Sequence, residues 1–319
     1  MRIVLDGMGG DNAPQVVVEG AVAATKEMLH EIIIVGQEEA INECLKNTGY
    51  TGDKISVVNA TEVITNEEAP VRAVRSKKDS SIVKGINMVK AGEGDVFISA
   101  GSTGALLATI YPVIGSEPSL LTDAGANAEC KPNNLLEFGI MGSVYMEKVI
   151  GRANPSVGLV NNGSEENKGT TLTKAAHEML KKSHLNFIGN VEARELPNGA
   201  CDVIVADGFT GNAILKLTEG MGLMFLRELK KRFFADTKSK LGALLLKRQL
   251  MGIKTEMNYS EYGGAPILGV KGALLKMHGS SDALAVKQTI MKAIPYVEGK
   301  VVEIIESSVL EIEDIVTAE

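Results

Sequence analysis

The chain has 319 residues, of which 45% are hydrophobic and 23% charged, as in ordinary soluble globular proteins. This composition excludes a disordered chain, a collagen and a coiled-coil rod, and the length suits one large α/β domain or two ordinary ones. The formal net charge of −7 argues against a general nucleic-acid-binding protein, which would be basic. We therefore expect no nucleic-acid partner.

Cysteine usage and the amino-terminal residues indicate the compartment. The three cysteines are odd in number and widely spaced: Cys44, Cys130 and Cys201. They predict neither a disulfide framework nor a C-x-x-C zinc site, which favours a reducing cytoplasm. Asp6 stands where a signal peptide needs its apolar stretch, which argues against export. Residues 96–116 carry no charge and could span a bilayer by length, but their glycines and serines favour a buried strand, a polar turn and a buried helix.

Short apolar runs alternate with segments of helical periodicity. The apolar runs predict buried strands at Ile3–Leu5, Ile32–Val35, Ile55–Val58, Val96–Ile98, Val157–Val160, Phe187–Ile188 and Val203–Val205. The periodic segments predict helices at Gln15–Leu29, Ser80–Lys90, Asn133–Ile150 and Thr170–Lys182. Alternation of this kind predicts an α/β fold with a mostly parallel sheet and helices on both faces. No break interrupts it, so we expect a single domain over residues 1–319.

The pattern changes after Asn212. Residues from Ala213 to about Phe234 have helical periodicity, and a second apolar and basic segment follows at Lys238–Arg248. The chain returns through Tyr262–Val270 and ends in helices from Ser280. We therefore predict a helical excursion at about 213–262 that protrudes from the domain.

Glycine with Asp, Asn, Ser or Thr recurs after the predicted strands. Six such strings stand at Asp6–Asn12, Ser99–Gly104, Asp123–Asn127, Asn161–Ser164, Gly189–Asn190 and Asp207–Asn212. Ligands of parallel sheets bind at the carboxyl ends of the strands. A glycine loop at a helix start presents backbone N–H groups to an anion, so the six strings together predict a site for a phosphate-sized anion.

Several common chemistries lack their motifs. The string Gly7-Met8-Gly9-Gly10 fails the dinucleotide fingerprint at its third glycine, and no P-loop Gly-Lys-Ser/Thr is present, which disfavours nicotinamide and ATP. No G-x-S-x-G string supports a serine hydrolase. His278 precedes a predicted helix start capped by Ser280 or Ser281. Its role is left open between a base of the site and a structural partner.

Taken together, seven strings in chain order resemble the bacterial phosphate acyltransferase family over nearly the whole length. They are Val4–Pro14, Ser99–Ala105, Asp123–Asn127 with Cys130–Pro132, Gly189–Glu192, Asp207–Asn212, Tyr262–Pro266 and His278–Asp282. The resemblance implies a fold like those of isocitrate and isopropylmalate dehydrogenases and phosphotransacetylase, and a homodimer. It implies transfer of the acyl group of acyl-acyl-carrier-protein to inorganic phosphate, which gives acyl phosphate for a downstream membrane glycerol-3-phosphate acyltransferase.

One segment departs from the family pattern. Members usually carry a basic, glycine-containing stretch before the strand that precedes Asp123, whereas Ala108–Val113 is shorter and lacks those basic residues. Either the protein has lost a loop, which would put that loop's part in substrate entry in doubt, or the printed sequence omits a disordered one near Thr109 and Ile110. We favour the second explanation.

Attack of phosphate on a thioester needs bound phosphate, an oriented carbonyl and donors to the oxyanion, but no protein nucleophile, cofactor or metal. For phosphate we expect Ser102, Thr103, Gly104 and Lys168. For the thioester we expect Asn127, Asn162 and Asn212, with His278 as a further catalytic candidate. For other substrate contacts we expect Asp6, Gly9, Asp11, Lys131 and Asp207, although the three aspartates are equally consistent with turn caps.

Two further questions concern the donor and the location. An acyl-coenzyme A donor, as in phosphotransacetylase, and a non-enzymatic anion-binding regulator are the alternatives, with a decarboxylating dehydrogenase third. Basic residues flank an apolar string in the helical excursion, which predicts peripheral membrane contact of a cytoplasmic protein and a carrier-protein dock nearby. The membrane contact is expected at Leu241, Leu244, Leu245 and Leu246. The same leucines are equally consistent with packing in a helical dimer.

Overall fold

The computed structural model describes residues 1–65, 68, 70–101, 106–113, 117–249, 252 and 264–317. The chain forms two compact units. Unit 1 comprises Met1–Leu107, Glu147–Arg152 and Ser260–Glu319, and unit 2 comprises Ala108–Met146 and Ala153–Tyr259. The single continuous domain expected from the sequence thus appears as two units. The α/β alternation continues wherever the chain passes from one unit to the other, so periodicity alone does not mark the division.

Unit 1 is built on a seven-stranded sheet of order β3-β2-β1-β4-β12-β11-β5. The first five strands in this order are parallel, and β11 is antiparallel to both its neighbours. The strands are β1 (Arg2–Asp6), β2 (Glu31–Gly36), β3 (Ile55–Asn59), β4 (Val96–Ser99), β5 (Leu106–Leu107), β11 (Ala265–Leu268) and β12 (Ala273–Lys276). The helices are α1 (Gln15–Thr25), α2 (Glu38–Thr48), α3 (Pro70–Ser76), α4 (Ser81–Lys90), α10 (Ala283–Glu298) and α11 (Val301–Thr317).

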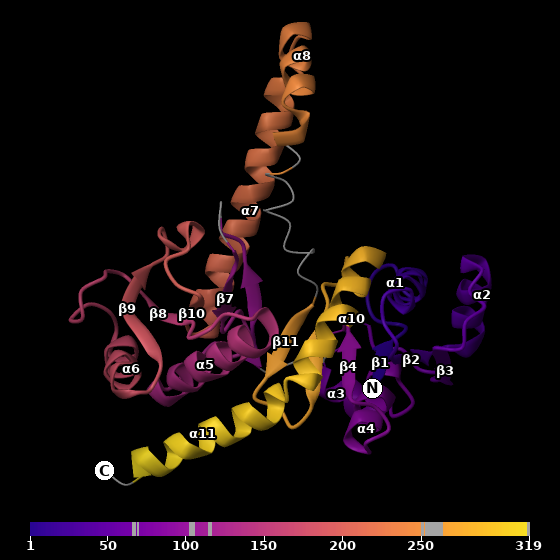
Figure 1. The fold of residues 1–319 in the computed structure, drawn as a ribbon, viewed down its shortest axis with the longest axis horizontal. Coiled ribbons are helices and arrows are strands. Elements are labelled where there is room, and N and C mark those ends of the chain that lie inside the picture. Colours follow the sequence, from indigo (N-terminus) through magenta and orange to yellow (C-terminus); the bar gives the residue numbers. More distant parts are fainter. Residues whose placement is uncertain are drawn as a thin grey trace. The chain divides into compact units, whose positions relative to one another are not determined.

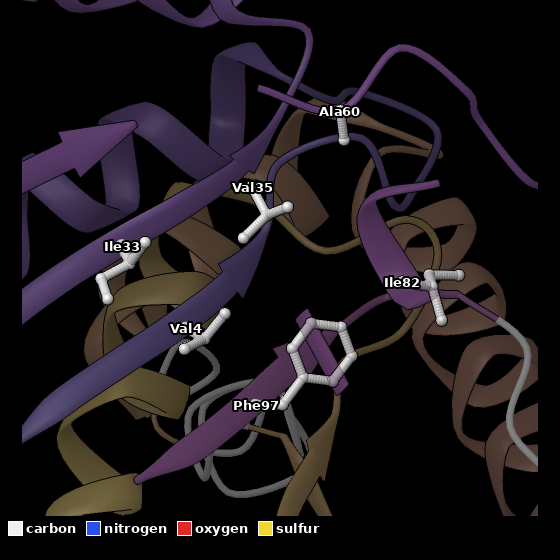
Figure 2. Packing of buried hydrophobic residues seen from close by; sticks show 6 residues of the cluster. All are labelled: Val4, Ile33, Val35, Ala60, Ile82 and Phe97. Atoms are coloured by element: carbon white, nitrogen blue, oxygen red, sulfur yellow. The ribbon is translucent and has the colours of Figure 1, made fainter. Parts of the chain in front are cut away.

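Helix α4 covers one face of this sheet because alternate strand residues point toward it. Figure 2 shows the resulting cluster, in which Phe97 of β4 and Ile82 of α4 lie with four further side chains. These are Val4, Ile33, Val35 and Ala60. Helices α1 and α10 pack against each other so closely that a Cβ added at Gly20 would lie 2.5 Å from Val286 Cβ.

Unit 2 is built on a five-stranded sheet of order β6-β7-β10-β8-β9, in which only the β6–β7 pair is antiparallel. The strands are β6 (Thr109–Tyr111), β7 (Ser119–Thr122), β8 (Ser156–Asn161), β9 (Asn186–Glu192) and β10 (Val203–Val205). The helices are α5 (Pro132–Tyr145), α6 (Thr171–Lys182), α7 (Gly208–Phe233) and α8 (Thr237–Leu245). A π-helical turn (Met146–Ile150) continues α5, and a 3-10 turn (Leu196–Asn198) follows β9.

The predicted helical excursion is present. Helix α7 begins at Gly208, five residues earlier than predicted, and Figure 1 shows it running away from the sheet of unit 2 with α8 beside its far end. Beyond its first turn most of the side chains of α7 are exposed, including the apolar Leu217, Met221 and Met224. No helix in the described part of the chain is long and apolar enough to cross a bilayer.

Two secondary-structure predictions were wrong. Leu106–Leu107 and Thr109–Tyr111 form strands, where the sequence predicts a buried helix. Gly189–Asn190 lies inside β9 rather than in a loop after it, because the strand extends to Glu192. The seven predicted strands and four predicted helices all correspond to observed elements, and the parallel pairing of most strands is confirmed.

Candidate active-site residues at the strand ends

In unit 1, the loops that follow three neighbouring parallel strands are hydrogen-bonded to one another. Met277 N after β12 donates to Ser99 O at the end of β4 (2.8 Å). Asp11 N after β1 donates to Gly279 O (2.8 Å), so the β1 and β12 loops are joined as well. We call the loops of residues 7–12, 99–101 and 277–281 the unit 1 edge. The edge contains Gly9, Asp11 and His278, and the strand β12 that precedes His278 was not predicted from the sequence.

Asp6 forms hydrogen bonds with residues of the unit 1 edge. Its side chain is fully buried, and its carboxylate accepts hydrogen bonds from Ser99 Oγ (2.6 Å) and Met8 N (3.1 Å). Ser99 Oγ in turn accepts from Gly101 N (2.9 Å). Burial raises the pKa of Asp6, although these hydrogen bonds oppose the shift. A Cβ at Gly9 would lie 2.5 Å from the Asp6 carboxylate, so glycine is required there for the close approach.

The predicted phosphate residues Ser102, Thr103 and Gly104 lie outside the described residues. Gly101, which directly precedes them, is held by Ser99 and therefore by Asp6. Asp11 is exposed, and only its backbone N–H is engaged by a hydrogen bond within the edge. His278 is also exposed, with Nδ1 2.7 Å from Ser280 Oγ.

In unit 2, a second buried aspartate gathers the turn after β7. Asp123 is fully buried, and its Oδ1 accepts from Gly125 N and Ala126 N (both 2.9 Å). Its Oδ2 accepts from Asn127 N (2.6 Å) and Asn127 Nδ2 (2.8 Å). One amide hydrogen of Asn127 is therefore committed to the turn, and its second amide hydrogen and its side-chain oxygen are free of this contact. The sequence singled out Asn127 and missed the aspartate that positions it.

The start of α7 packs on this turn. Asp207 is the N-cap of α7 and accepts from Thr210 N (2.9 Å) and Thr210 Oγ1 (2.7 Å), so its turn-cap interpretation has direct support. Gly208 N donates to Asn127 O (2.8 Å), and Gly211 is so close to Asp123 O that a Cβ could not be placed there. Asn212 is exposed, and its side chain lies beside Gly125.

The loop after β8 presents Asn162 and Lys168. Asn161 Oδ1 accepts from Asn162 N (2.9 Å), and Asn161 Nδ2 donates to Lys168 O (3.2 Å), so one side chain orders both residues through their backbones. The side chains of Asn162 and Lys168 are exposed, and no described residue forms an ion pair with the Lys168 ammonium. Asn161 thus holds the backbone of the loop, while the Lys168 ammonium and the Asn162 side-chain amide have no partner among the residues that the structure describes.

Two buried side chains on α6 and β9 support the same loop. Asn190 Nδ2 donates to Glu165 O (2.9 Å), and Asn190 Oδ1 lies 3.0 Å from Nδ1 of His177, which is buried against the edge of the Phe187 ring. His177 is thus in the core. Asn190 contacts the loop from within the strand, and it is not one of the exposed amides.

Lys131, a predicted substrate contact, and the neighbouring Cys130 follow the Asp123 turn. Lys131 is exposed at the start of α5, where its backbone N–H donates to Asn134 Oδ1 (2.9 Å). Burial raises the pKa of the Cys130 thiol, which disfavours a nucleophilic thiolate. No group of three or more metal-ligating side chains occurs among the residues that the structure describes.

The four predicted membrane leucines are on or just after α8. Leu241, Leu244, Leu245 and Leu246 are between 46% and 76% exposed. Four exposed cations flank them, and these are Lys238, Lys240, Lys247 and Arg248. The four leucines are thus accessible in the described part of the chain, as the predicted membrane contact requires.

Both units, taken separately, thus expose polar donors at the carboxyl ends of a mainly parallel sheet. Solved phosphotransacetylases share this fold. The chain matches one from Streptococcus pyogenes with a TM-score of 0.58 over 93% of this chain and 94% of that one, at 16% identity. A phosphotransacetylase from Staphylococcus aureus matches with a TM-score of 0.56 over 94% of both chains, at 14% identity. The protein therefore has the α/β fold of the phosphotransacetylases.

Sequence similarity identifies the family. The fatty acid synthesis protein family matches residues 1–109 and 106–304. A phosphate acyltransferase from Alkaliphilus oremlandii is 51% identical over 331 residues, covering 98% of this chain and 99% of that protein. One from Clostridioides difficile is 49% identical over 321 residues, covering 95% and 94%. The chain belongs to the phosphate acyltransferase family and is an acyltransferase. The two family segments meet at 106–109, beside the segment where the sequence departs from the family pattern.

Proposed function

We propose that the protein transfers the acyl group of acyl-acyl-carrier-protein to inorganic phosphate, giving acyl phosphate and free carrier protein for phospholipid synthesis. The observation that carries the proposal is that side-chain amides and the Lys168 ammonium stand at strand ends of unit 2, where no described residue forms an ion pair with the ammonium and no described cysteine favours the thiolate. Such a site binds an anion and orients a carbonyl, and it leaves the bond-making atom to the substrate. The family membership supports phosphate as the acceptor.

In the proposed reaction a phosphate oxygen attacks the thioester carbonyl carbon, a C–O bond forms, and the carbonyl electron pair moves to oxygen. The carbon–sulfur bond then breaks as the carbonyl re-forms, and the carrier thiol leaves as a thiolate that takes a proton from water. Lys168, with Ser102, Thr103 and Gly104, offsets the phosphate charge. The free hydrogens of Asn127, Asn162 and Asn212 donate to the thioester oxygen as negative charge develops there.

The remaining predicted residues have other parts in the proposed scheme. Asp6 and Asp207 are engaged by their own turns, so we assign them to positioning rather than to substrate contact. Gly9 and Asp11 lie in the unit 1 edge. Lys131 adds an exposed cation in unit 2. The scheme requires no cofactor and no metal.

The competing donor is acyl-coenzyme A, which has the same thioester and a different carrier. The test supplies phosphate with long-chain acyl-carrier-protein or with acyl-coenzyme A and measures thiol release. We expect phosphate-dependent release with the carrier protein and much slower release with coenzyme A. Equal or faster release with coenzyme A would favour phosphotransacetylase-like chemistry, and release from neither would favour an anion-binding regulator.

Two variants test the phosphate assignment. Ser102→Ala combined with Thr103→Val, and separately Lys168→Met, should raise the phosphate KM while the thermal unfolding temperature stays the same. An unchanged phosphate KM in the double variant would remove Ser102 and Thr103 from the phosphate site. A change confined to the unfolding temperature of Lys168→Met would make that lysine structural.

We further propose a cytoplasmic homodimer that touches the membrane through the leucines of 241–246, where it can deliver acyl phosphate to a membrane glycerol-3-phosphate acyltransferase. The support is the pairing of exposed leucines with cations, since each basic residue near an anionic surface contributes about 1 kcal/mol. The acidic carrier protein would dock on the neighbouring basic residues. Replacing Leu244 and Leu245 with Glu should abolish liposome co-sedimentation while dimer mass and activity persist. A dissociated dimer would show that these leucines pack between subunits.

A further inference from the structure

The hydrogen bonds around His278 define which of its ring nitrogens carries the proton. Ser280 N lies 3.2 Å from His278 Nδ1, and Ser280 Oγ lies 2.7 Å from the same atom. A backbone N–H can only donate, so Nδ1 must be the acceptor in this arrangement. A neutral imidazole has one protonated nitrogen, and the proton is therefore on Nε2.

Backbone hydrogen bonds hold the loop that carries His278 on both sides of this residue. Met277 N donates to Ser99 O, Gly279 O accepts from Asp11 N, and His278 O accepts from Ser281 N (3.0 Å). Yet the imidazole itself is exposed, and no described residue accepts a hydrogen bond from its Nε2. A neutral ring with a fixed tautomer thus presents one N–H outward from the unit 1 edge.

We propose that His278 acts in the reaction as a neutral hydrogen-bond donor through Nε2–H, and that Ser280 is the positioning residue that holds this tautomer. The proposal rests on the proposed acyl transfer and deepens it, because the Nδ1 lone pair of His278 is engaged by Ser280 and does not serve as a general base. The donor serves negative charge that grows on the substrate as the phosphate oxygen attacks. Phosphate is already an anion at neutral pH, so its attack requires no proton removal by a histidine.

The side chains of Gln and Asn separate a donor from a base. The amide nitrogen of Gln reaches the position of Nε2 and donates, whereas that of Asn reaches only the position of Nδ1, and neither amide is a base. With acyl-carrier-protein and phosphate, His278→Ala should lower kcat about 100-fold with little change in the phosphate KM. His278→Gln should stay within about tenfold of the wild type, and His278→Asn should resemble His278→Ala. A Gln variant as poor as the Ala variant would overturn the donor role.

The positioning role of Ser280 has a spectroscopic readout. In ¹⁵N-histidine-labelled protein, His278 should show a protonated Nε2 and an unprotonated Nδ1 near neutral pH. Ser280→Ala removes the hydroxyl at 2.7 Å from Nδ1 and keeps only the backbone N–H at 3.2 Å, so the fraction of the Nδ1-protonated tautomer should rise and kcat should fall about fivefold. Ser280→Thr should restore both properties. Ser281→Ala, which removes a neighbouring hydroxyl that takes no part in the contact, is the matched control and should match the wild type.

These outcomes separate the inference from the proposed function. A protonated Nδ1 in the wild type, or a tautomer unchanged by Ser280→Ala, would overturn the assignment whatever the substrate is. If the wild type releases no thiol with phosphate, the proposed function fails, and the nitrogen spectra still test the tautomer.

Discussion

Replacing Asp123 with Asn tests how the turn beside α7 is built. Asp123 Oδ1 accepts from Gly125 N and Ala126 N, and Oδ2 accepts from Asn127 N and Nδ2. An asparagine has one carbonyl oxygen, so it can serve only one of these two pairs. Its NH₂ group must face the other pair, and donors would then oppose donors.

The magnitude follows from that count. The loss of two charge-assisted hydrogen bonds costs about 1.5–3 kcal/mol each. The neutral asparagine avoids the desolvation cost of a buried carboxylate, which offsets part of this loss. We therefore expect the free energy of unfolding to fall by about 3 kcal/mol. Since Asn127 loses a support, kcat should fall as well.

Urea unfolding measures the stability, and hydrogen exchange at residues 125–127 locates the effect in unit 2 even if the two units unfold separately. Exchange should accelerate for one pair of donors and not for the other. Asp236→Asn is the matched control, because the exposed Asp236 caps α8 by the same kind of contact and Asn is an equally good cap. A loss at Asp123 below about 1 kcal/mol, or equal to the loss at Asp236, would refute the argument.

Three further outcomes are expected. Burial raises the pKa of Asp6, so the native state keeps a proton on this side chain at pH values where the unfolded chain has released it. The stability that this proton confers is lost as pH rises above about 4. In urea unfolding, the destabilisation caused by Asp6→Asn should therefore shrink with rising pH, and growth with pH would contradict the burial argument. Gly211→Ala should destabilise unit 2 by about 2–4 kcal/mol or prevent its folding, because a Cβ collides with Asp123 O. Gly220→Ala, which is in open space on the same helix, should be neutral or stabilising by up to about 1 kcal/mol, and equal thermal unfolding temperatures of the two variants would contradict this. Asn190→Ala should cost about 1–3 kcal/mol because Glu165 O and His177 Nδ1 lose their partner, and a thermal unfolding temperature equal to that of the wild type would show that the contact adds nothing.

Much of the fold was predictable because its strands are continuous apolar runs. The buried parallel strands β1, β2, β4 and β10 stand out from their amphipathic helices, so periodicity locates them. The short edge strands β5 and β6 carry no such signal, and pairing with β11 and β7 decides their conformation. The division into two units depends on contacts far apart in sequence, which no local pattern encodes.

The candidate site was predictable at the level of loops and less so at the level of roles. Five of the six glycine-rich strings lie at strand ends, but the buried carboxylate of Asp123 looks in sequence like one more turn residue. Only the four donors around it show that it supports Asn127. The sequence predicts Ser280 or Ser281 as the helix cap, but this was wrong, because Asp282 caps α10 and accepts from Ala285 N. Only the distance to His278 Nδ1 shows what the Ser280 hydroxyl contacts.

The central claim is that phosphate, rather than water or an enzyme side chain, receives the acyl group. The most direct measurement follows ³¹P spectra of the wild-type protein with inorganic phosphate and acyl-acyl-carrier-protein, together with the free thiol, in the absence of any nucleotide. The account predicts a new acyl phosphate resonance that grows in equal amount with the thiol. Thiol release with free fatty acid and an unchanged phosphate resonance from the start would contradict it, because the acceptor would then be water.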